Sequence, residues 1–250
     1  CEYINDEDVR CDLYSRMVGD GGQWGPKQKL PSPINMDSVT NTQPHIAYDS
    51  ISNSDVLYFV SDRAGGKGGL DIYYAPMSDD GTFGTVMNLS SINTEGNEAT
   101  PFMDLSSNTL FFSSDGLKGL GGYDIYSSKK SGSIYAEASH LKVPVNSSYH
   151  DLYYSYYADN QEAYFSSNRE SAMYLDPAKK ACCFDIFNVQ YESIIIDLNA
   201  LVFDDLTKEP LPGATITLRD KETGEIIKAI TNEEGNDFSF VVKRDREYEI

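Results

Sequence analysis

The sequence predicts an all-β protein with two parts, a repeated unit of short strands followed by a small β-sandwich. Three observations predict this organisation. The chain is rich in aromatic strand formers, with 18 Tyr and 11 Phe among its 250 residues. One pattern recurs along residues 1–192, and a different pattern, in which apolar and polar residues alternate, occupies residues 193–250. Aromatic and β-branched runs that end at Gly, Asn or Asp are typical of strands.

The repeat is clearest in three segments that begin at residues 57, 110 and 163. They read LYFVSDRAGGKGGLDIYY, LFFSSDGLKGLGGYDIYS and AYFSSNRESAMYLDPAKKACCFDIFN, and a partial copy, CDLYS, begins at residue 11. The stretches between them agree as well, because WGPKQKLPSPIN matches FGTVMNLSSIN and TQPHIAY matches ATPFMDL. Each unit offers four strand candidates, and stacked units of about 40 to 50 residues indicate a β-propeller. Residues 1–192 are therefore predicted to be propeller blades, incomplete at the N-terminus.

The glycine-rich stretch AGGKGG at 64–69 invites a comparison with phosphate-binding loops. Such loops pass from a strand into a helix whose N-terminal amides hold the phosphate. Here the stretch joins two predicted strands, so we expect a hairpin loop. Its glycines, Gly65, Gly66, Gly68 and Gly69, are expected to adopt turn conformations at positive φ.

The second part has the alternation of strands with one buried face. Ala214, Ile216 and Leu218 alternate with polar residues, and so do Phe238, Phe240 and Val242. A period of two predicts half-buried strands. Turn-forming residues separate these runs at 210–213, 221–224 and 233–236. Residues 193–250 are therefore predicted to form a small β-sandwich, incomplete at the C-terminus.

Charge and hydropathy exclude some classes of partner. The net charge is −19, from 20 basic and 39 acidic residues, and such a field repels nucleic-acid backbones and anionic membranes. No apolar run reaches the 18 residues that a membrane-spanning helix needs. The chain also lacks the sequence motifs of zinc peptidases and of serine hydrolases. The sequence thus predicts no catalytic residue and a chain that is not an enzyme.

The motifs S-D-R-x-G-G…D-I-Y-Y and L-F-F-S-S-D-G…G-G-Y-D-I-Y resemble the WD40-like repeats called PD40, which occur in TolB-type propellers and in OmpA-family proteins of Bacteroidetes. The tail, with P-L-P-G-A-T-I-T-L and T-N-E-E-G-N-D-F-S-F, resembles a carboxypeptidase regulatory-like domain, a transthyretin-like sandwich. The domain order and the C-C-F-D-I-F variant are similar to PorE-like lipoproteins of the type IX secretion system.

That resemblance implies a non-catalytic protein-interaction scaffold in the periplasm, associated with the outer membrane. Its partners would be envelope proteins such as secretion-system subunits, with peptidoglycan bound through a domain outside this chain. Cys1 allows two interpretations, a lipidated mature N-terminus and a truncation within a blade, and the incomplete blade favours truncation. An alternative function is a glycan-binding or glycan-cleaving propeller, since sequence leaves open a carboxylate pair among 39 acids.

Four aspartates occupy the same place in each unit, namely Asp12, Asp71, Asp124 and Asp185. We expect a structural role, in which each carboxylate accepts hydrogen bonds from backbone or hydroxyl donors of a neighbouring strand. A second set, Asp62, Asp115 and Asn168, follows the aromatic strands. A ring of carboxylates can attract Ca²⁺, but no calcium-loop motif is present, and we predict no cofactor and no metal site.

Arginines and cysteines complete the candidate residues. Arg63 and Arg169 are expected to anchor a protein partner, because arginine is enriched at interface hot spots. Cys1 and Cys11 are candidates for a disulfide that closes a blade hairpin. Cys182 and Cys183 are either a vicinal disulfide or free thiols, and a redox role would need an exposed thiolate in a basic setting.

Overall fold

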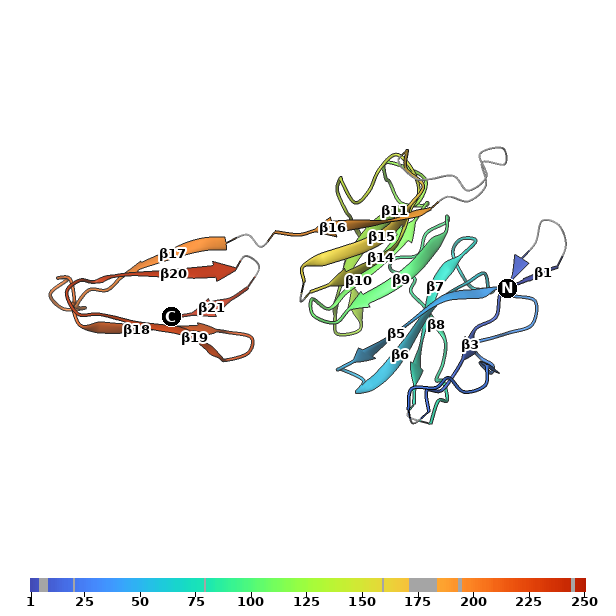
Figure 1. Ribbon diagram of the computed structural model, residues 1–250, viewed down its shortest axis with the longest axis horizontal. Helices are drawn as coiled ribbons and strands as arrows, with labels where there is room; N and C mark the ends of the chain where they lie inside the picture. Colours follow the sequence, from blue (N-terminus) through green and yellow to red (C-terminus); the bar gives the residue numbers. More distant parts are fainter. Residues whose placement is uncertain are drawn as a thin grey trace. The chain divides into compact units, whose positions relative to one another are not determined.

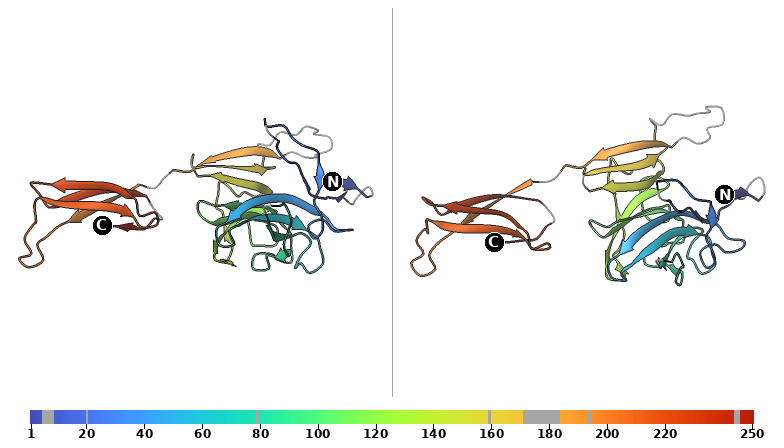
Figure 2. Two further views of the ribbon diagram at one scale, coloured as in Figure 1. Left: turned by 90° about the horizontal axis from the view of Figure 1, so that it is seen from below. Right: turned by 60° about the horizontal axis from the view of Figure 1, so that its bottom comes forward.

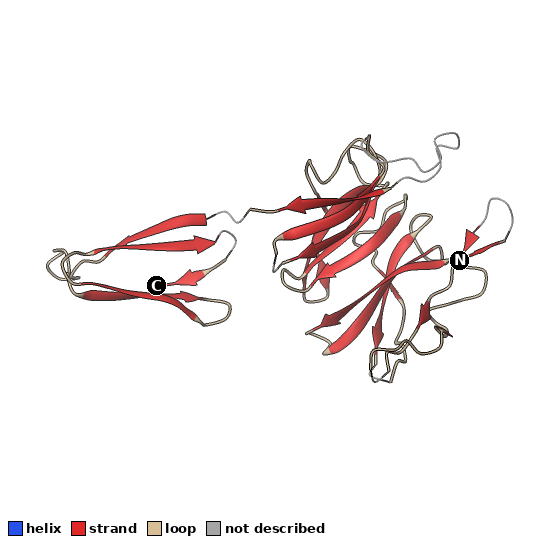
Figure 3. Ribbon diagram, viewed as in Figure 1, coloured by secondary structure: helices blue, strands red, loops and turns tan. Residues whose placement is uncertain are grey.

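The computed structural model describes residues 1–250 except 5–8, 20, 79, 159, 171–183, 193–194 and 244–245. All regular secondary structure in the described part is β-strand (Figure 3), which confirms the predicted all-β class. The chain divides into two compact units, Cys1–Gln190 and Tyr191–Ile250. Among the described residues, no helix has the length and apolarity to cross a membrane.

The first unit contains three successive antiparallel sheets (Figure 1). The first sheet has the order β5-β6-β7-β8, with strands β5 (Asn41–Asp49), β6 (Ser54–Ser61), β7 (Asp71–Met77) and β8 (Met87–Asn88). The second contains β9 (Glu98–Asp104), β10 (Thr109–Ser114) and β11 (Asp124–Ser131), with the short strands β12 (Ile134–Tyr135) and β13 (Ser139–His140) both paired to β11. The third has β14 (Asp151–Tyr157), β15 (Glu162–Ser167) and β16 (Asp185–Gln190).

Shorter strands precede these sheets. They are β1 (Glu2–Tyr3) and β2 (Val9–Arg10), which pair with each other, and β3 (Tyr14–Ser15) and β4 (Gln28–Lys29), which form a second pair. A disulfide joins Cys1 to Cys11 across the first pair. The sequence CDLYS therefore lies where the repeat places it, at the start of an outer strand pair.

Each sheet packs on its neighbour through a separate apolar core. Tyr58 of β6 and Phe112 of β10 are buried in the core between the first and second sheets. Ile125 of β11 and Phe165 of β15 are buried in the core between the second and third. Burying one such side chain contributes about 1.5 to 3 kcal/mol, so each sheet depends on its neighbour for much of its stability.

The first strands of the three sheets lie next to one another, with β9 contacting both β5 and β14 (Figures 1 and 2). Sheet topology thus brings together three segments whose first residues are more than 50 positions apart in sequence. This junction positions the candidate functional site.

The second unit has two small sheets. Strands β17 (Ile195–Leu201) and β20 (Asp237–Lys243) form one, and β19 (Ile226–Asn232), β18 (Ala214–Asp220) and β21 (Tyr248–Glu249) form the other. Alternate residues of β18 and β20 meet in one core that includes Leu218 and Phe240. The alternation in the sequence therefore corresponds to one buried face on each of these strands.

Candidate functional site

Each first strand contains one residue other than glycine with a left-handed backbone. These are Gln43 in β5, Thr100 in β9 and Tyr153 in β14, with φ of 51°, 52° and 57°. The pairing register shifts next to each of them, so each marks a β-bulge. Left-handed residues of this kind cost free energy and cluster at functional sites. Three equivalent bulges at one junction therefore identify the junction as a candidate site.

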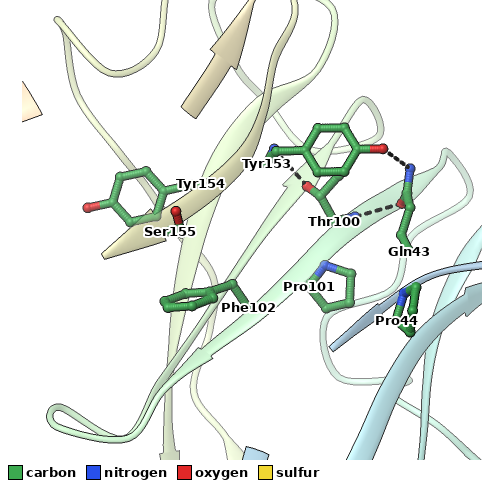
Figure 4. Close-up of a pocket in the computed structure, with 8 residues that line it drawn as sticks. All are labelled: Gln43, Pro44, Thr100, Pro101, Phe102, Tyr153, Tyr154 and Ser155. Carbon is green, nitrogen blue, oxygen red and sulfur yellow. Dashed lines mark hydrogen bonds between the residues drawn. The ribbon is translucent and has the colours of Figure 1, made fainter. Parts of the chain in front are cut away.

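The three bulge residues bind one another in a closed ring (Figure 4). The side-chain oxygen of Gln43 accepts a hydrogen bond from the Thr100 amide at 2.8 Å. The Thr100 hydroxyl accepts one from the Tyr153 amide at 3.2 Å. Gln43 Nε2 donates to the Tyr153 hydroxyl at 3.4 Å. Each bulge thus turns its side chain toward the bulge of another repeat. We call Gln43, Thr100 and Tyr153 the bulge ring.

A pocket of about 170 Å³ opens beside the bulge ring. Its lining consists of the ring residues and five neighbours on the same strands, Pro44, Pro101, Phe102, Tyr154 and Ser155 (Figure 4). Tyr153 is 56% exposed, so much of its surface is accessible to a ligand. None of the eight lining residues is charged.

Two of the aromatic residues that line the pocket pack against further aromatic rings. The Phe102 ring lies 5.0 Å from that of His45, and the Tyr154 ring lies 4.7 Å from that of Phe111, measured between centroids. Burial lowers the pKa of His45, because desolvation disfavours the imidazolium. The imidazole beside the pocket is therefore neutral at physiological pH.

The residue types define what the pocket can do. Tyrosine, phenylalanine and proline present apolar surface, and the amide of Gln43 with the hydroxyls of Thr100 and Ser155 supplies donors and acceptors. Glycoside hydrolysis uses two carboxylates flanking the scissile bond, and no Asp or Glu is among the eight lining residues. These residues are suited to holding an uncharged polar ligand with an apolar face.

Three of the repeated aspartates, Asp71, Asp124 and Asp185, are the first residues of β7, β11 and β16. Asp71 accepts hydrogen bonds from the backbone amides of Lys67 and Gly68, and Asp124 accepts them from Leu120 and Gly121. Their donors belong to the loop that precedes each aspartate, whereas we expected donors on a neighbouring strand.

Three of these aspartates, Asp12, Asp71 and Asp124, have a second side-chain contact, with a residue of a segment farther along the chain. Lys29 forms a salt bridge to Asp12 at 2.7 Å, and the Asn88 amide donates to Asp71 at 3.0 Å. The His140 ring nitrogen lies 3.4 Å from Asp124. Asp185 opens β16 and pairs in register with Ser167, as Asp71 does with Ser61 and Asp124 with Ser114.

Arg63 and Arg169 have internal partners, which corrects their assignment as partner anchors. Arg63 is 7% exposed and donates to the carbonyl oxygens of Pro33 and Ile34, to Asn41 and to Ser61. Arg169 donates to the carbonyls of Pro144 and Val145, to Asp151 and to Ser167. Each guanidinium also lies over two aromatic rings. Both arginines therefore connect segments of the fold.

The side chains considered for Ca²⁺, two carboxylates and one amide, accept hydrogen bonds from backbone amides. Asp62 accepts from Thr40 at 2.7 Å, Asp115 accepts from Asn97 at 2.6 Å, and Asn168 accepts from His150 at 2.9 Å. In the part of the chain that the structure describes, no group of three or more His, Cys, Asp or Glu side chains is placed to hold a metal ion. Cys182 and Cys183 lie outside the described residues.

The predicted site residues do not include the bulge ring. TQPHIAY and ATPFMDL are matched in the sequence as strands, and Gln43 and Thr100 each directly precede the proline of those stretches. The repeated pair of a polar residue and a proline was the sequence signal that could have pointed to this site. The sequence does not indicate that Gln43 and Thr100 have a left-handed backbone, because neither residue is a glycine.

No protein-family model matches the chain, and the search of curated proteins found no match. The solved structures that are similar to it include two enzymes. An N-acetylgalactosamine deacetylase from F. plautii, solved with blood group B trisaccharide, is 12% identical with a TM-score of 0.45, over 91% of this chain and 79% of that one. A thermostable family-43 glycoside hydrolase is 11% identical with a TM-score of 0.40, over 89% of this chain and 74% of that one.

These likenesses correct two predictions. The similar structures are enzymes named for glycan substrates, so the predicted secretion scaffold and the prediction that the chain is not an enzyme are withdrawn. The envelope partners, secretion-system subunits among them, stay a prediction. At these identities and TM-scores the likenesses assign no activity or substrate to this chain.

Proposed function

We propose that the first unit is a set of PD40-type propeller blades that binds a neutral saccharide at the pocket beside the bulge ring. The observation that carries this proposal is the uncharged, tyrosine-walled pocket at the junction of three repeats. Two further features support the propeller arrangement, namely the adjacent first strands β5, β9 and β14 and the apolar cores between successive sheets.

The chemistry of the lining suits a sugar ring. One face of a pyranose is made largely of C–H groups, which pack on tyrosine, phenylalanine and proline, while its hydroxyls need hydrogen-bonding partners. The 3.4 Å contact between Gln43 and Tyr153 is long for a hydrogen bond. A saccharide hydroxyl that separates these two groups would replace a weak interaction with two shorter ones.

Charge and size narrow the ligand class. The chain carries a net charge of −19, and the lining provides no cation to balance an anionic sugar, so uronic acids and sulfated glycans are disfavoured. The volume of about 170 Å³ is below the roughly 300 Å³ of clefts for drug-sized ligands. We therefore expect the pocket to hold one terminal sugar residue while the rest of the glycan lies outside.

A glycan array tests this proposal, with the chain and two tyrosine variants as probes. Tyr153→Ala removes the pocket wall and is expected to reduce binding to the best neutral glycan at least tenfold. Tyr157→Ala is the matched control, because Tyr157 lies on the same strand with the same 56% exposure and does not line the pocket. Equal losses for both variants, or binding confined to anionic glycans, would contradict the proposal.

We also propose a periplasmic location and a carboxypeptidase regulatory-like identity for the second unit. The Cys1–Cys11 disulfide supports an oxidising compartment. The alternating strands β18 and β20 around one core support the sandwich. Finding Cys1 and Cys11 reduced in chain purified under alkylating conditions from its native envelope would argue against this location.

A further inference from the structure

In three repeats, the strand that begins at or just after the repeated aspartate has its outer edge covered by a short segment. Strand β4 pairs with β3, β8 pairs with β7, and β13 pairs with β11. Each covering segment has a leucine followed, a few residues later, by Ile-Asn or Val-Asn, at Asn35, Asn93 and Asn146. We call these three stretches, 28–35, 87–93 and 139–146, the edge segments.

The asparagine of each edge segment binds the strand at two points. Asn93 accepts a hydrogen bond from the Ile72 amide at 3.0 Å and donates to the Ile72 carbonyl at 2.9 Å. Asn146 makes the same pair of bonds to Ile125, at 2.7 and 2.8 Å. Asn35 does so with Leu13, at 2.8 Å in both cases. A neutral side chain that satisfies both backbone groups of one residue is a specific clamp.

The third sheet offers the same edge. Ile186 of β16 pairs with Ser166 as Ile72 pairs with Val60 and Ile125 with Ser113, so its amide and carbonyl also face the outer edge. Ile186 is 79% exposed, whereas Ile72 and Ile125 are fully buried. Among the described residues, no strand pairs with this edge of β16. An open strand edge with an exposed apolar residue is a template for strand addition.

We propose that the edge of β16 at Ile186 binds an extended peptide with the chemistry of an edge segment. The occupant would carry a leucine and, a few residues later, an asparagine directly after an Ile or Val, as all three edge segments do. This site is separate from the saccharide pocket and does not depend on it.

The test is fluorescence polarisation of a labelled peptide, KQKLPSPINM, which copies residues 27–36, titrated with the full chain. The same peptide with Asn35→Ala is the matched control. We expect saturable binding of the first peptide and at least a tenfold loss for the second, because the clamp is removed. No binding, or equal binding of both peptides, would overturn the proposal.

Two chain variants locate the binding. Ile186→Pro deletes the outward-facing amide and is expected to abolish binding, while Ile186→Val keeps that amide and is expected to bind as the parent does. Circular dichroism establishes that each variant is folded, and the peptide pair decides the question if the proline variant is not. Unchanged binding to folded Ile186→Pro would overturn the proposal, because the peptide would then occupy another edge. A dimer of the parent chain that Ile186→Pro dissociates would also overturn it, in favour of a second copy as the occupant.

Discussion

The guanidinium of Arg169 lies 2.6 Å from the carboxylate of Asp151, a side chain with no exposed surface. The same guanidinium donates to the carbonyls of Pro144 and Val145. It therefore ties the end of β15 to the segment that leads into β14. In the first repeat Arg63 makes the corresponding contacts with Pro33, Ile34 and Asn41. The two arginines hold consecutive parts of their repeats together.

Arg169→Ala should lower the free energy of unfolding of the first unit by about 3 kcal/mol, because it leaves a buried carboxylate without its cation. Urea denaturation followed by circular dichroism measures the change. Arg16 is exposed and serves as the control, with an expected change for Arg16→Ala within about 0.5 kcal/mol. A similarly small effect of Arg169→Ala would show that the internal contacts do not hold the fold.

Asn93→Ala should destabilise the first unit by about 1 to 3 kcal/mol, because the buried Ile72 amide loses its acceptor. Ser90 lies on the same segment and is exposed, so Ser90→Ala is expected to change stability by less than about 0.5 kcal/mol. The urea midpoints of the two variants measure how much the asparagine clamp stabilises the fold. Equal midpoints would show that it contributes nothing.

Gly68→Ala should destabilise the first unit by about 2 kcal/mol or more, because a Cβ there would overlap the carbonyl oxygen of Gly96 in the next loop. Gly19 provides a control, since a Cβ at that position meets its nearest atom at an ordinary 3.7 Å. Gly19→Ala is expected to be neutral or slightly stabilising. Equal thermal midpoints of the two variants would refute the close approach.

Glu98 should make stability depend on pH. Burial raises the pKa of its carboxyl, while hydrogen bonds from Ser114 and Thr94 oppose the shift. With a folded pKa above the unfolded one, its contribution is full below the ordinary glutamate pKa and declines as pH rises through the raised value. Glu98→Gln does not titrate, so parent stability minus variant stability should fall as pH rises from acid to neutral. Denaturation at several pH values measures this difference, and a constant or rising difference would contradict the raised pKa.

The repeat and the alternation predict the strands well, because the side-chain period of two follows directly from extended backbone. Leu218 and Phe240 are buried where the alternation predicts. The glycine loop was predicted less accurately. Of its four glycines, Gly65 has a positive φ, whereas Gly68 is needed for its close approach to Gly96. Such an approach depends on how two repeats pack, which local sequence does not encode.

The residues of the candidate site were harder to predict for the same reason. Gln43 and Tyr153 are 110 residues apart in sequence, and their contact exists because β5, β9 and β14 converge. The arginines were predicted as interface anchors because arginine is enriched at hot spots. Their internal partners include backbone carbonyls 30 and 25 residues away in sequence. Carbonyl oxygens are present at every residue and leave no sequence signal.

Saccharide binding at the bulge ring is tested most directly by an amide NMR titration of the chain with a neutral oligosaccharide. The amides of Thr100 and Tyr153 both donate within the bulge ring, so these two signals should shift in a saturable way. The Tyr157 amide, farther along β14, should stay unchanged. Saturable shifts confined to residues away from the pocket, or none at millimolar saccharide, would contradict binding at this pocket.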